Sequence, residues 1–169
     1  MNIRNMRIDK VNYYLNIAET VLERGTCVRR NVGAVIVKDD EIISTGYAGA
    51  PRGRKNCSDI GFCRREKLEI PKGQRYELCR SVHAEANAII CTPRSDMIGS
   101  TLYLACHDAK TNELFGDISP CTMCKRLIIN AGVSTVITRN SPDTYTVTDV
   151  NDWIENDDSL AEDYMALTY

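Results

Sequence analysis

The sequence predicts an α/β fold with a partly parallel sheet, formed as one domain by a chain of 169 residues. Strand-like and helix-like segments alternate along the chain, and this order is typical of strands that pair in parallel. The length suits one hydrophobic core and is short for two. Hydrophobic residues make up 43% and charged residues 26%, which is an ordinary globular composition and not that of a disordered or coiled-coil protein.

The first expected elements are a helix and a hairpin. Apolar residues recur at spacings of three and four between Val11 and Leu22, which is the period of a helix. Asp9 can cap this helix, and Gly25 can end it. A buried-strand pattern at 32–37 and a second strand at 42–47 flank a polar turn at 38–41, so we expect them to pair as a hairpin.

Residues 48–80 differ in character from the rest of the chain. They contain four glycines, two prolines and three cysteines without a clean periodicity. An irregular stretch of this length in a compact domain is usually functional or held in place by something. We therefore expect a single domain over 1–169 with an irregular, cysteine-containing insertion at about 48–80.

The second half of the chain continues the alternation. We expect a helix at 81–91 that Pro93 stops, a strand at 101–106, and a helix at 120–131 that Gly132 closes. A strand at 133–138 and a short edge strand at 144–148 follow. The apolar spacing near Trp153 indicates a terminal helix, and residues 160–167 a further acidic one.

Charge and hydropathy exclude several classes of protein. The 21 basic and 23 acidic residues give a net charge of −2, and no basic stripe is visible, which argues against a nucleic-acid polymer as partner. No apolar run approaches the roughly 20 residues needed to span a bilayer, and no secretory signal is recognisable at the start. We therefore expect a cytoplasmic protein without a membrane partner. Its eight cysteines then indicate metal or redox chemistry and not a disulfide scaffold.

Two short motifs carry the chemistry, and each lies at the start of an expected helix. One is the His-Ala-Glu triplet at 83–85, and the other is the Pro-Cys-Thr-Met-Cys run at 120–124. Cys121 and Cys124 are three residues apart, so both sulfurs lie on one face of the first turn. The free N–H groups of a helix start favour thiolates, and Pro120 is tolerated there. His83, Cys121 and Cys124 can thus bind zinc and leave a fourth position for water, as in a catalytic site.

Glu85 is two residues beyond His83 and is better placed beside the metal-bound water than on the metal. A carboxylate there can accept the proton of the water and pass it on. A lone Cys-x-x-Cys pair is commonly a redox pair or half of a structural zinc site, and a lone His-x-Glu occurs by chance. Their conjunction is much rarer and is the known signature of zinc nucleobase deaminases.

With these motifs the sequence resembles the cytidine/deoxycytidylate deaminase superfamily, and most closely its deoxycytidylate (dCMP) branch. The likeness runs from about residue 9 to 138 and includes Asn87, a feature of that branch. It implies a cytidine deaminase-like, three-layer α/β/α fold with a five-stranded mixed sheet, and a homo-oligomer that is commonly a hexamer. The matching segments are Cys27, residues 32–37, 46–47, Gly49, Pro51, Gly53, 83–89, 120–124 and 129–133.

The resemblance also implies substrate contacts. The backbone N–H of Ala84 would bind the carbonyl of the base, and the backbone near Ser119 would accept from the exocyclic amine. The dCMP branch usually has an asparagine that contacts the sugar where this chain has Ala48, and an alanine side chain cannot make that hydrogen bond. Asn31 is a candidate to replace it. Arg52 is a candidate phosphate ligand, because the guanidinium group of arginine suits phosphate. Further basic residues near the expected pocket are Arg54, Arg29 and Arg30. A solvated surface position is nevertheless the more ordinary role for each of these arginines.

The remaining cysteines allow a second metal site. Some relatives in the dCMP branch carry a structural zinc with ligands at the positions of Cys27 and Cys57, and Cys63 and Cys79 could complete a closed tetrahedron. Such a site would hold the irregular segment in order. Alternatively, the four are reduced and inert thiols. Cys91 and Cys106 lie in apolar stretches and are expected in the core, and His107 at the surface or pocket rim.

The sequence thus predicts a zinc-dependent hydrolytic deaminase with a free pyrimidine nucleotide as substrate, dCMP in the first place, and with one catalytic and one structural Zn²⁺. Ala48 keeps open a deaminase of another small aminated heterocycle or nucleoside. A non-catalytic zinc-binding module is a third alternative. The presence of Glu85 argues against it, because zinc binding alone does not need that carboxylate.

Overall fold

The computed structural model describes residues 7–157, and the expected acidic helix at 160–167 lies outside them. The chain forms a five-stranded sheet with the order β2-β1-β3-β4-β5. Strands β3 and β4 pair in parallel, and every other neighbouring pair is antiparallel. The strands are β1 (Arg30–Lys38), β2 (Glu41–Tyr47), β3 (Thr101–Asp108), β4 (Thr135–Arg139) and β5 (Tyr145–Asp149).

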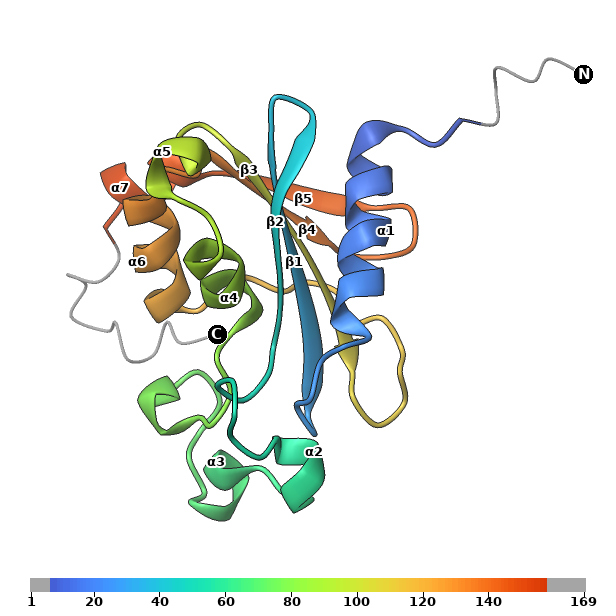
Figure 1. The fold of residues 1–169 in the computed structure, drawn as a ribbon, viewed down its shortest axis with the longest axis vertical. Coiled ribbons are helices and arrows are strands. Elements are labelled where there is room, and N and C mark those ends of the chain that lie inside the picture. The colour runs from blue at the N-terminus through green and yellow to red at the C-terminus, as the bar shows by residue number, and fades with distance from the viewer. Residues whose placement is uncertain (1–6, 158–169) are drawn as a thin grey trace, which may run out of the picture.

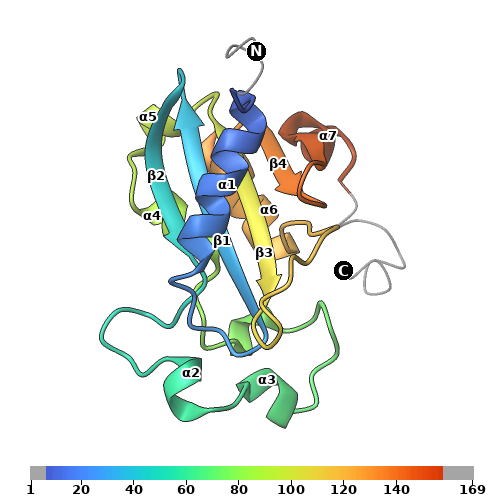
Figure 2. The same ribbon diagram turned by 90° about the vertical axis from the view of Figure 1, so that its right-hand side faces the viewer.

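Helices cover both faces of this sheet, as Figures 1 and 2 show. Helix α1 (Lys10–Leu22) packs on one face against a core that includes Val35, Val37 and Tyr103. The opposite face carries α4 (Ala84–Ile90), α5 (Arg94–Met97), α6 (Thr122–Ala131) and α7 (Val150–Glu155). The predicted three-layer α/β/α fold with a mixed sheet is therefore confirmed.

The ends of the helices follow their sequence signals. The Asp9 carboxylate accepts a hydrogen bond from the backbone N–H of Asn12 at 3.0 Å and so caps α1. Gly132 closes α6 with a φ of 83°, in the left-handed region that glycine adopts without strain. Helix α4 begins later than the predicted residue 81, because His83 is its extended N-cap residue.

Residues 48–80 form a separate lobe at one end of the sheet (Figure 1). The lobe contains the short helices α2 (Cys57–Ile60) and α3 (Arg64–Lys67) and the 3₁₀ turn η2 (Tyr76–Leu78). It is tied to the rest of the domain by the Gly49–Val82 bridge and by a hydrogen bond from the Ser58 N–H to the Thr26 carbonyl at 3.1 Å. Among residues 7–157, no helix has the length and apolar character that crossing a membrane requires.

Candidate functional site

The starts of α4 and α6 bring the predicted zinc ligands together. His83 is the N-cap residue of α4, Cys121 is the N-cap residue of α6, and Cys124 lies in the first turn of α6. The His83 Nδ1 atom lies 3.4 Å from the sulfur of each cysteine. All three ligand atoms lie within 4.8 Å of one another. Two segments almost 40 residues apart in sequence therefore form one compact donor set.

This donor set fits zinc. Tetrahedral coordination with the usual bond lengths of about 2.05 Å to nitrogen and about 2.3 Å to sulfur separates the two donors by about 3.6 Å. The distances of 3.4 Å in the protein are close to that value. Two sulfurs and one imidazole are ligands that zinc prefers, and a set of three leaves one coordination position open.

The protonation of the three groups also favours a cation at this point. A hydrogen bond from the Cys124 thiol, opposed by burial and supported by His83, lowers the pKa of Cys121 to about 4. Burial lowers the pKa of His83, but hydrogen bonds to Cys121 and Cys79 and the charge of Glu85 outweigh it and raise that pKa to about 11. Without metal the site thus holds a thiolate beside an imidazolium. Binding of a divalent cation would displace the protons on His83 and Cys124.

Glu85 follows the ligand His83 in the first turn of α4 and is 6% exposed. Burial raises the pKa of its carboxyl group, because a buried carboxylate loses its hydration. It lines the same pocket as His83 and Cys121 but lies outside the three-residue ligand set. The carboxyl group is thus next to the metal centre without being part of it.

Strand β2 fixes the position of α4 against the sheet. A side chain on Gly46 would place its Cβ only 2.3 Å from the carbonyl oxygen of Ala84, so the glycine permits a close approach. The Ser44 hydroxyl donates to the Ala88 carbonyl at 2.6 Å. The amide of Asn87 donates to the Tyr47 carbonyl at 2.8 Å. These contacts set the depth at which α4 presents His83 and Glu85.

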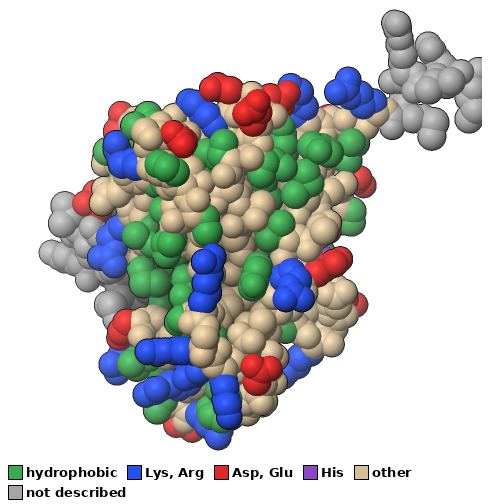
Figure 3. Space-filling model, in the orientation of Figure 1, with side chains coloured by type: hydrophobic (Ala, Val, Ile, Leu, Met, Phe, Trp, Pro, Cys, Tyr) green, Lys and Arg blue, Asp and Glu red, His purple; other side chains and the backbone are tan. Residues whose placement is uncertain are grey.

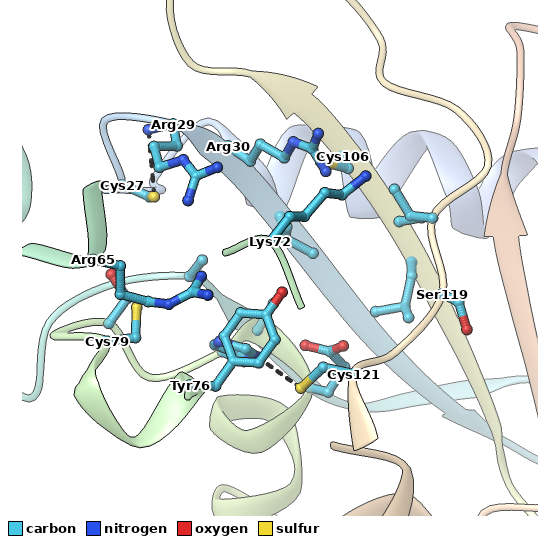
Figure 4. A pocket seen from close by; sticks show the side chains of 18 of the residues that line it. Cys27, Arg29, Arg30, Arg65, Lys72, Tyr76, Cys79, Cys106, Ser119 and Cys121 are labelled. Atoms are coloured by element: carbon cyan, nitrogen blue, oxygen red, sulfur yellow. Dashed lines mark hydrogen bonds between the residues drawn. The ribbon is translucent and has the colours of Figure 1, made fainter. Parts of the chain in front are cut away.

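The metal centre lies at the floor of a pocket between the sheet and the lobe formed by residues 48–80, the cysteine lobe (Figure 4). Three of the residues proposed to contact substrate line it, namely Ala84, Ser119 and Ala48. The backbone of Ala48 is already used, since its N–H donates to the Val32 carbonyl at 3.0 Å. Ala48 thus lines the pocket without a side chain that could donate or accept a hydrogen bond.

Two of the proposed substrate contacts do not reach this pocket. Asn31 lies between Arg30 and Val32, which line the pocket, so the alternation of a strand turns its side chain to the α1 face. There its Oδ1 lies within 2.5 Å of where a Cβ on Gly25 would be. Arg52 is exposed, and its Nη2 lies 3.9 Å from the Cys91 sulfur. Neither Asn31 nor Arg52 therefore lines this pocket, and their contact with substrate stays a prediction.

The structure agrees only in part with the positions expected for Cys91, Cys106 and His107. Cys106 is buried as predicted, and it lines the pocket. Cys91 is exposed, and its expected core position was wrong because it lies just past the end of α4, where the helix turns to solvent. His107 is half-buried on the α1 side of the sheet, where its Nε2 lies 3.5 Å from Glu19. It is therefore away from the pocket rim.

The four cysteines proposed for a second zinc lie in one region of the protein. Burial raises the pKa of Cys57, and the nearby sulfurs of Cys27, Cys79 and Cys63 add to this effect. They do not come as close together as the first set. Within residues 7–157, the group of His83, Cys121 and Cys124 is the one set of at least three such ligand atoms that all lie within 4.8 Å of one another.

Several pocket residues had not been identified from the sequence. They come from the cysteine lobe, and the most buried is Arg65, which is 4% exposed. Its guanidinium group lies 4.3 Å from the centre of the Tyr76 ring, and that ring packs edge-on at 5.1 Å against His83. A sequence signal exists, because residues 52–80 contain nine basic and four acidic residues in a chain that is acidic overall. Figure 3 shows this concentration of lysine and arginine at the same end of the molecule.

A mixed sheet that carries a three-ligand centre with a buried carboxyl group beside it defines a zinc-dependent hydrolase of the deaminase type. The profile of the cytidine and deoxycytidylate deaminase zinc-binding region matches residues 8–140. The chain belongs to this family. It is a zinc-binding deaminase, and its predicted class is confirmed.

Individual relatives agree with this assignment. The deoxycytidylate deaminase of Mycobacterium phage D29 is 39% identical over 135 residues, which are 78% of this chain and 94% of the relative. That of Schizosaccharomyces pombe is 30% identical over 141 residues, 83% of this chain but only 40% of the longer relative. The dCMP deaminase of cyanophage S-TIM5, solved in complex with dCMP and dUMP, superposes with a TM-score of 0.54 at 27% identity, covering 80% of this chain and 84% of that one.

Proposed function

We propose that this chain hydrolyses dCMP to dUMP and ammonia. The observation that carries the proposal is the buried carboxyl group of Glu85 beside the ligand set of His83, Cys121 and Cys124, at the floor of the pocket. The relatives named as deoxycytidylate deaminases, and the phage enzyme that holds dCMP and dUMP, support this choice of substrate.

Glu85 acts as the proton carrier in this mechanism. Zinc, when bound, lowers the pKa of a water molecule and so makes a nucleophile available near neutral pH. Glu85 accepts a proton from the water and delivers it to ring N3 while the oxygen attacks C4. The same carboxyl group then takes the remaining proton of the attacking oxygen and passes it to the amine, which leaves as ammonia while the C4–oxygen bond becomes the carbonyl of dUMP. Its raised pKa suits a group that holds a proton between these steps.

The backbone of the pocket orients the base. The N–H of Ala84, at the start of α4, would donate to the carbonyl of the base, and the backbone near Ser119 would accept from the exocyclic amine. Both residues line the pocket. Two contacts at opposite edges of the ring place C4 at the open side of the metal centre.

A second, structural zinc bound by Cys27, Cys57, Cys63 and Cys79 is part of the same proposal. The sulfurs of Cys27, Cys63 and Cys79 are near enough to Cys57 to raise the pKa of its thiol. Three of the four cysteines belong to the lobe at 48–80, which has few buried residues of its own. A closed set of four thiolates is the usual composition of a structural zinc site. The alternative is four reduced thiols, and the zinc content of the protein distinguishes the two.

The assembly and cellular location are proposed from the family. We expect a homo-oligomer, with a hexamer as the state to test, in the cytoplasm and without a nucleic-acid polymer as partner. Light scattering of the purified protein would give its oligomeric state.

A panel of substrates tests the proposed reaction. Zinc-loaded protein would be assayed by ammonia release with dCMP, CMP, deoxycytidine, cytidine and modified pyrimidines. We expect the highest kcat/KM with dCMP. Ala48 favours a second candidate, deamination of another aminated heterocycle, since it offers the sugar no hydrogen bond. Equal rates with dCMP and deoxycytidine, or turnover of neither, would favour that second candidate.

A further inference from the structure

Four basic side chains line the pocket that holds the metal centre, namely Arg29, Arg30, Arg65 and Lys72. Arg29 is neutralised by Glu66, which lies 3.0 Å from its Nε. Within the part of the chain that the structure describes, no carboxylate lies within 4.0 Å of the other three. The pocket wall therefore carries three basic side chains that no carboxylate of the described residues pairs with.

Arg65 is the most unusual of the three, because it is buried. Its Nη2 donates to the carbonyl oxygens of Pro71, at 3.0 Å, and of Gln74. Its Nε is buried and has no hydrogen-bond partner among the described residues. Burial of an unpaired charge costs several kcal/mol, so a bound anion at this wall would offset a cost that the folded protein otherwise carries.

Arg30 and Lys72 approach the same space from other segments. The guanidinium group of Arg30, at the start of β1, lies 3.5 Å from the centre of the Phe115 ring and is held by it. Lys72 comes from the loop after α3, and its side chain has no partner among residues 7–157. Figure 4 shows Arg30 and Lys72 above Tyr76 and Arg65 beside it, on the side of the ring away from Cys121.

We propose that Arg30, Arg65 and Lys72 bind the phosphate group of the nucleotide substrate. This inference rests on the proposed function, since it assigns one end of the pocket to the part of the substrate that does not react. A phosphate dianion needs several converging donors, and guanidinium groups fit its oxygens. Substrate bound in this way has its base directed to Glu85, and the surplus of basic residues at 52–80 attracts it from solution.

Two substitutions of the phosphate site test the assignment by specificity. Lys72→Gln and Arg30→Gln remove one charge each, whereas Arg65 is left intact because it also donates to the backbone. We expect the ratio of kcat/KM for dCMP over that for deoxycytidine to fall at least about tenfold in each variant. Lys55→Gln is the matched control, an exposed lysine of the same lobe outside the pocket, and should keep the ratio within about twofold. An unchanged ratio in both test variants would overturn the assignment.

Binding experiments separate this inference from the proposed reaction. Zinc-loaded wild-type protein and Lys72→Gln would be titrated calorimetrically with dUMP and with deoxyuridine. Preferential binding of dUMP that is lost in the variant supports the phosphate site, even if no pyrimidine is turned over. Equal affinity of the wild-type protein for dUMP and deoxyuridine refutes it, even if dCMP is deaminated.

Discussion

Gly46→Ala should damage both the stability and the activity of the protein through the contact between β2 and α4. The new Cβ would lie 2.3 Å from the Ala84 carbonyl oxygen and 2.4 Å from the Ala88 amide nitrogen, where ordinary contacts begin at 3.4 Å. Both clashing groups belong to the backbone of one helix, so α4 has to move by about 1 Å. The movement would also stretch the buried hydrogen bond of Ser44.

The size of the effect follows from these contacts. Overpacking of this kind costs about 1–3 kcal/mol, and a weakened buried hydrogen bond adds about 1 kcal/mol, so we expect a loss of about 3 kcal/mol in the free energy of unfolding. Displacement of a reacting group by about 1 Å can reduce turnover about 10²-fold. Because α4 carries both His83 and Glu85, the folded variant should lose kcat to about this extent.

A second glycine provides the comparison. Gly33→Ala would place its Cβ 2.0 Å from the Ala18 carbonyl oxygen, so it should destabilise the protein by a similar amount through α1, which covers the opposite face of the sheet. Urea unfolding gives the stability of each variant, and kcat is measured where both are fully folded. Equal losses of kcat in the two variants, or a Gly46→Ala protein as stable and active as wild type, would refute the reasoning.

Zinc content tests whether the chain has two separate zinc sites. Protein purified without chelator should hold two zinc ions per chain by elemental analysis. Cys63→Ala should lose one of them and melt at a lower temperature, because metal binding at a structural site stabilises the fold. The control Cys91→Ala, at an exposed cysteine, should keep both zinc ions. The two-site proposal would be contradicted by a content of one zinc per chain with freely titratable thiols at Cys27, Cys57, Cys63 and Cys79. Burial and a hydrogen bond to Asp40 raise the pKa of Tyr14 to about 12 from 10.0, so its contribution to stability should be full below pH 10 and lost as the pH rises towards 12. In urea titrations, Tyr14→Phe should lose less free energy of unfolding than wild type as the pH rises from 10 to 12. Identical pH profiles of stability for the two proteins would exclude this contribution of Tyr14.

The catalytic centre could be predicted from the sequence because its signals are local. His83 and Cys121 both precede helices, and the short spacing within each motif fixes which side chains lie together. Most elements of the sheet were predictable for the same reason, since apolar runs of 32–37 and 101–106 are confirmed as β1 and β3. That the two motifs lie together in the fold was predicted from the ligands that a zinc ion needs and not from the periodicity of the sequence.

The substrate end of the pocket was less predictable. Arg65 and Lys72 lie in a lobe of short helices and loops, where no periodicity shows which side chains face inward. The sequence could not show that the Asn31 side chain turns to the α1 face, because its position on a strand does not fix the face, whereas the register of β1 does. The exposure of Cys91 depends on where α4 ends, which apolar composition alone does not decide.

Replacement of Glu85 by glutamine tests the proposed chemistry most directly. The amide has nearly the same shape as the carboxyl group and lies outside the ligand set, so Glu85→Gln should keep its zinc and its melting temperature. Formation of dUMP from dCMP, followed by chromatography, should fall at least about 10²–10⁴-fold, because a neutral amide cannot carry the proton. A zinc-loaded, folded Glu85→Gln protein with turnover close to that of wild type would contradict the role of Glu85.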